Sequence, residues 1–177
     1  MKKKLMILLI LLALPLAVMA QDDTAMVTKM LQQADDMGKK FIAKDYKAFL
    51  KYSHPAVIKS MGGEDRVYDQ TVRDLKDLEN KEVTFAAIKF GVPSKIIAVG
   101  DERQAVIPEI IEMYIPGGKL TNTASMLAIS LDKGANWYFV DTGGHNLLNM
   151  KALLPSLSEE LVIPEPQDAS FEEIKAE

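Results

Sequence analysis

The sequence predicts an α+β fold in a single domain, with helices first and a curved antiparallel sheet after them. Up to about residue 80, apolar residues recur at three- and four-residue spacing, which is the period of a helix. After Lys81 they recur at every second position, which is the period of a strand. A run of helices followed by a run of strands is the element order of α+β proteins.

Four helices are expected before the change of period. The first spans residues 24–43 and has one apolar face. Asp45 is placed to cap a short second helix, and Pro55 is placed in the first turn of a third. The pair Gly62-Gly63 ends that helix, and residues 64–80 form a fourth with its own apolar stripe.

The strands are expected from residue 83 onwards. Residues 83–90 and 96–99 have strand composition, and three long strands occupy residues 103–141. Gly117-Gly118 closes the first long hairpin, and residues 132–136 close the second.

The second hairpin fixes which side chains share a face of the sheet. A five-residue loop predicts three cross-strand pairs: Leu131 with Trp137, Ile129 with Phe139 and Leu127 with Asp141. These residues would then form one large apolar face that the first helix covers. Pro108 has no N–H group to donate, so a bulge or an edge position, and strong curvature, are expected there.

The two ends of the chain are expected to lie outside the domain. Residues 1–20 have three lysines, an apolar run and then Val18-Met19-Ala20, the order of a secretory signal peptide cleaved near Ala20. The mature protein is therefore expected to be periplasmic or secreted, without a stable membrane anchor. The domain spans residues 21–155. Residues 156–177 form an acidic extension that we expect to be mobile after residue 163. Its apolar cluster, Leu157, Leu161, Val162 and Ile163, is expected to dock on the domain, while residues 167–177 stay disordered, apart from the domain.

Composition excludes several classes of function. Residues 1–20 hold three of the 21 basic residues and none of the 25 acidic ones, so the mature net charge is −7, which argues against nucleic acid as a partner. The absence of cysteine excludes disulfides and thiol chemistry. Two histidines without metal-ligand spacing, no nucleophile elbow and no phosphate loop predict neither a metal site nor a cofactor.

Several local patterns resemble the nuclear transport factor two-like superfamily over residues 24–144. They are the long first helix, the helix carrying Asp45, Tyr46, Phe49 and Leu50, the His54-Pro55 helix that ends in two glycines, and the final strand Trp137-Tyr138-Phe139-Val140. The superfamily includes ketosteroid isomerases and SnoaL-type polyketide cyclases. The resemblance implies a cystatin-like cone whose sheet wraps the long helix around an internal pocket. It does not extend to the isomerase mechanism, because residues 24–43 contain no tyrosine.

Asp141 and Glu112 are the candidate catalytic residues. With the pairing given above, Asp141 lies at the mouth of an apolar cavity, where its pKa would rise and it would act as an acid or base. The alternative is that Asp141 accepts hydrogen bonds from the turn at residues 142–144. Glu109 and Glu112 are three apart and so point to opposite faces, and an inward Glu112 beside Tyr114 would form a pocket pair. Alternatively, the bulge leaves both glutamates in solvent.

The candidate ligand-binding residues are Tyr46, His54, Tyr114 and Trp137. His54 has an alternative role as a helix-entry residue that caps or packs. The leading hypothesis is an exported, non-enzymatic module that binds a small apolar ligand or a protein partner through the mouth of the cone. Two alternatives stay open. One is an enzyme of the isomerase, cyclase or hydrolase type with an Asp or Glu acid–base. The other is a structural homodimer that contacts its partner through the outer sheet face. Its contacts would be Val106, Ile110 and Tyr114, or their opposite-face neighbours Ile111, Met113 and Ile115.

Overall fold

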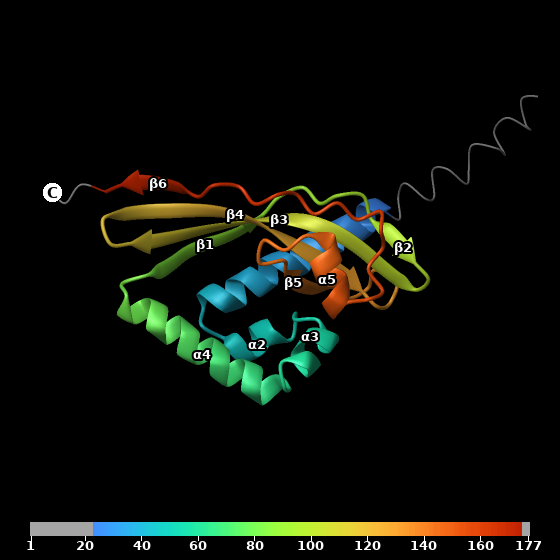
Figure 1. Ribbon diagram of the computed structural model, residues 1–177, viewed down its shortest axis with the longest axis horizontal. Helices are drawn as coiled ribbons and strands as arrows, with labels where there is room; N and C mark the ends of the chain where they lie inside the picture. Colours follow the sequence, from blue (N-terminus) through green and yellow to red (C-terminus); the bar gives the residue numbers. More distant parts are fainter. Residues whose placement is uncertain (1–22, 175–177) are drawn as a thin grey trace, which may run out of the picture.

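In a computed structural model of the protein, residues 23–174 are described (Figure 1). The expected signal peptide and its cleavage site near Ala20 lie outside these residues. The described chain forms one α+β domain with a curved, six-stranded antiparallel sheet, as the sequence predicts.

The helices lie where the apolar periodicity placed them. The N-terminal helix covers residues 23–42, and it is followed by α2 (Tyr46–Leu50), α3 (Pro55–Ser60) and α4 (Glu64–Asn80). A last helix, α5 (Leu147–Leu153), follows the long strands. Each short helix has a side-chain cap at its start, because isolated turns of this length are unstable without one. The longest of the labelled helices, α4, lies away from the sheet and contacts α2 and α3 (Figure 1).

The sheet has two long central strands and four short outer ones. The strands are β1 (Thr84–Phe90), β2 (Ile97–Val99), β3 (Glu102–Ile115), β4 (Gly118–Ser130), β5 (Tyr138–Asp141) and β6 (Ser170–Glu173). Both β1 and β2 pair with β3, whereas β5 and β6 pair with the two ends of β4. The central β3–β4 hairpin therefore positions the four other strands.

Pro108 causes no bulge in this hairpin, and of the two expected possibilities it is the edge position that the structure has. Its pairing with Ser125 lies inside an unbroken β3–β4 register. The main-chain groups of every second β3 residue point toward the edge of β3 on which β1 and β2 lie. Those of Pro108 point into the gap between these two strands. The Pro108 carbonyl still accepts a hydrogen bond from Gly91 N at 2.9 Å. Pro108 is tolerated because β3 is locally an edge there. The irregularity that does occur lies in β1, between Phe85 and Ala87.

Both faces of the sheet are buried, which differs from the single apolar face expected. The face that we call the helix face packs against the N-terminal helix through Met30, Ala34 and Met37. Its own side chains are Ala105, Ile107, Met126, Ala128, Trp137 and Phe139. The opposite face, which we call the α5 face, is covered by α5 and the segment after it. Its cluster joins Val106, Leu127, Ile129 and Val140 to Met150, Leu154, Leu157 and Leu161.

The predicted pairing of β4 with β5 is wrong by one residue. Asp141 pairs with Met126, Phe139 with Ala128 and Tyr138 with Ile129. The connection from β4 to β5 is built by polar side chains: Ser130 Oγ accepts from Gly134 N at 2.8 Å, and Asp132 Oδ1 accepts from Asn136 N at 2.8 Å. These bonds set the loop geometry, and a shift of one residue moves side chains to the other face. Val106, one of the proposed dimer contacts, is itself a member of the buried α5-face cluster.

The acidic extension packs on the domain over a longer stretch than its apolar cluster predicts. Leu157 and Leu161 are buried on the α5 face, and β6 then pairs with β4 (Figure 1). Gly118 makes this docking possible. A Cβ atom there would lie 2.3 Å from the Glu172 carbonyl oxygen and 2.6 Å from the Phe171 ring. The expectation that residues 167–177 stay apart from the domain is therefore wrong for Ser170–Glu173.

Candidate functional site

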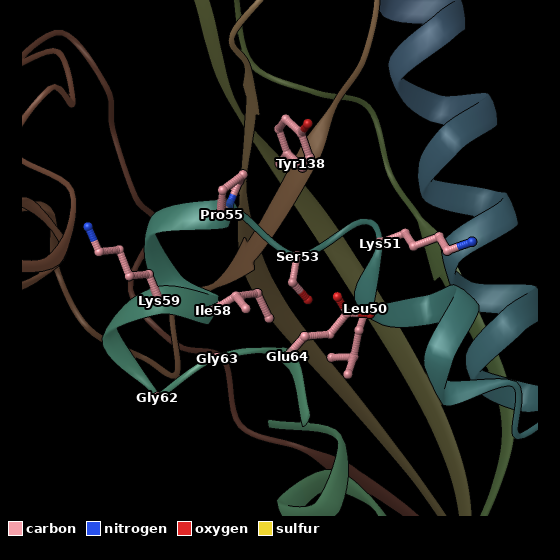
Figure 2. A pocket seen from close by; sticks show the side chains of 10 residues that line it. All are labelled: Leu50, Lys51, Ser53, Pro55, Ile58, Lys59, Gly62, Gly63, Glu64 and Tyr138. Carbon is pink, nitrogen blue, oxygen red and sulfur yellow. The ribbon is translucent and has the colours of Figure 1, made fainter. Parts of the chain in front are cut away.

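A pocket of about 680 Å³ opens beside α3, at the β5 edge of the sheet (Figure 2). We call it the α3 pocket. It is lined by residues from α2, α3, the α3–α4 turn and β5: Leu50, Lys51, Ser53, Pro55, Ile58, Lys59, Gly62, Gly63, Glu64 and Tyr138. None of these residues was predicted to contact a ligand. All of them except Tyr138 lie within residues 50–64, which run from the end of α2 through α3 to the start of α4, and β5 adds Tyr138.

The chain reaches this edge through main-chain contacts. Phe139 N donates to Tyr52 O at 2.7 Å, and Ser53 forms a parallel bridge to Phe139. The segment before α3 is thus fixed along the free edge of β5. On the other side, Gly62 and Gly63 both have φ of +98°, a conformation that favours glycine, and they turn the chain from α3 into α4.

Polar groups occupy a few positions in an otherwise apolar pocket. Figure 2 shows Ile58, Ser53 and Glu64 directed toward its middle, while Lys51 and Lys59 point away on opposite sides. Leu50 is buried at its base. This arrangement has the features of a small-molecule site: a volume within the usual range, apolar walls and a few convergent polar groups.

His54 supports one wall of the α3 pocket and does not line it. It is the N-cap of α3, and its Nδ1 accepts from Ala56 N at 3.2 Å. Its ring packs edge-on against Tyr138, with centroids 5.9 Å apart. Burial lowers the pKa of His54, against an opposing effect of Glu102. A neutral imidazole is also what the cap requires, because only an unprotonated Nδ1 can accept. The capping and packing alternative therefore describes the position of His54.

Asp141 ends β5 and is exposed. Its Oδ1 accepts from Gly143 N at 2.9 Å, the turn geometry given as the alternative to an acid–base role. Glu112 lies on the opposite face of the sheet from Asp141, between Lys89 and Lys119, with Lys119 Nζ at 2.7 Å. Hydrogen bonds from Lys119 and Lys89 lower the pKa of Glu112 to about 2. Neither carboxylate has the apolar surroundings that a proton-transfer role was expected to need.

The other three candidate ligand residues lie apart from one another. Tyr46 begins α2 and packs edge-on against Phe41, with centroids 5.9 Å apart. Tyr114 is 48% exposed near the end of β3. Trp137 is buried in the helix-face cluster, where its Nε1 donates to Gly134 O at 3.1 Å and its backbone N donates to Gln33 Oε1 at 2.7 Å. The structure brings no two of these three into one pocket.

Glu109, and not Glu112, is the carboxyl group that faces the helix side of the sheet. Its residue is 7% exposed, its side chain forms no hydrogen bond or ion pair with any described residue, and its carboxylate oxygens keep some contact with solvent. Burial, with a further contribution from the charge of Asp141, raises the pKa of Glu109 to about 7. Strict alternation along β3 would have found it, since Ala105, Ile107 and Glu109 share the helix face. The bulge expected at Pro108 concealed this.

No set of three or more histidine or acidic side chains with the geometry of a metal site occurs within residues 23–174. Over the same stretch, no helix has the length and apolar character needed to cross a membrane. Comparison with known proteins adds no assignment: no family model matches the chain, and neither a curated protein nor a solved structure is detectably similar to it.

Proposed function

We propose that the protein is an exported, non-enzymatic binding module that holds a small, largely apolar ligand in the α3 pocket. The observation that carries this proposal is the pocket itself, about 680 Å³ with Leu50, Pro55, Ile58 and Tyr138 among its walls. Ser53 and Glu64 would orient a hydroxyl or amine group of the ligand. The volume of the α3 pocket lies within the range of small-molecule sites.

We further propose that the fold is a cone of the nuclear transport factor two-like kind, with its ligand displaced from the interior. The order of helices and strands and the packing of the N-terminal helix on the curved sheet support this relation. The space between that helix and the sheet is filled by Met30, Met37, Trp137 and Phe139. The α3 pocket is therefore the better location for a ligand in this chain.

A single substitution tests the proposal. Ile58→Trp fills the pocket, whereas Val92→Trp adds the same side chain at a position that is 86% exposed and outside the pocket lining. With Nile red as an apolar fluorescent probe, wild-type protein and Val92→Trp should bind saturably with equal affinity. Ile58→Trp should bind at least about tenfold more weakly, or about 1.4 kcal/mol. Equal binding by all three proteins would rule out the α3 pocket as the site.

One observation favours a second function. Glu109 is buried without a partner while nearby Asp141 stays exposed and hydrogen-bonded. A buried carboxyl group with a raised pKa beside a second carboxylate is a candidate acid or base. The enzyme alternative therefore passes from Glu112 to Glu109.

A further inference from the structure

A second cavity, separate from the α3 pocket, lies along the outer edge of β4 between the end of β5 and the start of β6. We call it the edge groove. Its volume is about 410 Å³. Its walls are Pro108, residues 122–125 of β4, residues 141–144 after β5 and residues 164–167 of the extension. Because β6 holds the extension against β4, the groove is walled on both sides by segments distant in sequence.

The main chain of Thr123 faces this groove without a partner. Thr142 N donates to Ser125 O at 3.1 Å, and Ile174 N donates to Gly117 O at 3.1 Å. Ser125 and Gly117 therefore direct their main-chain groups toward the outer edge, and so do the residues two positions along. Thr123 is one of these, but it lies between the stretches that β5 and β6 cover. No described residue pairs with its N–H or C=O group across the edge.

The charge of the groove has one sign. Its lining contains Asp141 and Glu165 and no basic residue. Glu109 lies directly behind the lining, since it pairs with Ala124 in the β3–β4 register. Its side chain shares a face with that of Asp141, and no cation among the described residues neutralises either carboxyl group. A cationic group in the groove would supply the missing charge.

We propose that the edge groove binds an extended peptide segment that pairs with Thr123 through two main-chain hydrogen bonds and places a lysine or arginine side chain beside Asp141. The peptide residue that pairs with Thr123 projects its side chain on the same face of the sheet as Thr123. The peptide residues before and after it project on the opposite face, where Ala124 and Asp141 lie. The lysine or arginine is therefore next in sequence to the peptide residue that pairs with Thr123. Main-chain pairing at a sheet edge gives affinity, and the side chains give specificity.

Two short peptides test the proposal. The first is acetyl-Thr-Lys-Thr-Val-Thr-amide, and the second has glutamate in place of lysine. At millimolar concentration the lysine peptide should shift the amide NMR signals of Thr123, Ser125 and Thr142. The glutamate peptide should bind about tenfold more weakly. A lysine peptide that binds no better than the glutamate peptide would overturn the proposal.

Two variants locate the contacts. Thr123→Pro removes the N–H that faces the groove, at an edge position where proline is tolerated. Asp141→Asn removes the charge at nearly constant volume. Each should weaken binding of the lysine peptide about fivefold or more, while Asp77→Asn, on exposed α4, should leave it unchanged. Unchanged affinity in both groove variants would overturn the proposal. If Thr123→Pro does not fold, Asp141→Asn and the peptide comparison still decide it.

Discussion

Ile107→Asp and Leu127→Asp should each unfold the domain, although the two side chains project from opposite faces of the sheet. Both residues are fully buried, Ile107 on the helix face and Leu127 on the α5 face. A carboxylate in either position would lie in an apolar cluster without a cation. The cost is on the order of 5 kcal/mol, comparable with the total stability of a small domain.

Urea unfolding followed by circular dichroism measures this effect. Val92→Asp is the matched control, because that side chain is 86% exposed and its unfolding midpoint should barely move. A sheet with one apolar face would tolerate a charge on the other. If either Ile107→Asp or Leu127→Asp kept wild-type stability, the covering of both sheet faces would be wrong.

Glu109→Gln should stabilise the protein at pH 8 by about 3 kcal/mol, the free-energy equivalent of raising a carboxyl pKa from 4.5 to about 7. The folded protein binds this proton more tightly than the unfolded chain does. The contribution of Glu109 to stability is therefore lost as the pH rises from about 4.5 through about 7. Glutamine cannot ionise, so the variant should lack this part of the pH dependence.

Glu112→Gln is the control, since it makes the same change on the same strand but on the opposite face. Its pKa is lowered to about 2 by Lys119 and Lys89, so this variant should be less stable at neutral pH. Because Glu109 is still present in Glu112→Gln, the stability of this variant should still fall between pH 5 and pH 8, as in the wild type. Free energies of unfolding measured across that range decide the matter. A Glu109→Gln protein that is less stable than wild type at pH 8 would contradict the burial of an unpaired carboxyl group.

A stabilising effect of Glu109→Gln would also bear on function. A buried acid that weakens the fold has no structural reason to be there, and such residues are concentrated at sites that bind or react. Glu109 lies behind the edge groove, beside Ala124. The stability of Glu109→Gln therefore distinguishes a structural role of Glu109 from a functional one.

Local patterns in the sequence were enough to predict the helices. Asp45, His54-Pro55 and Gly62-Gly63 are signals whose physical effect is confined to a few residues. α2 and α3 begin at the first two, and the glycine pair separates the end of α3 from the start of α4. The hairpin at Gly117 was predictable for the same reason, because Gly117 has φ of +85° after a proline.

Features that no repeating pattern of apolar residues encodes were not predictable. The β4–β5 register is set by Ser130 and Asp132, whose side chains bond the loop's own N–H groups. The docking of β6 depends on Gly118, which lies about fifty residues earlier. The α3 pocket is lined by residues from the stretch 50–64, and Tyr138 of β5 is added to them only by the packing of α3 against the sheet edge. None of these arrangements leaves a periodic signal.

Native mass spectrometry of the protein purified from its own host tests the central claim, that a small ligand occupies the α3 pocket. Wild-type protein and Val92→Trp should carry the same additional mass, and that mass should disappear on denaturation. Ile58→Trp, purified in the same way, should have the mass of the bare chain. If Ile58→Trp retained the additional mass, or if wild-type protein carried none, the α3 pocket would not be the binding site.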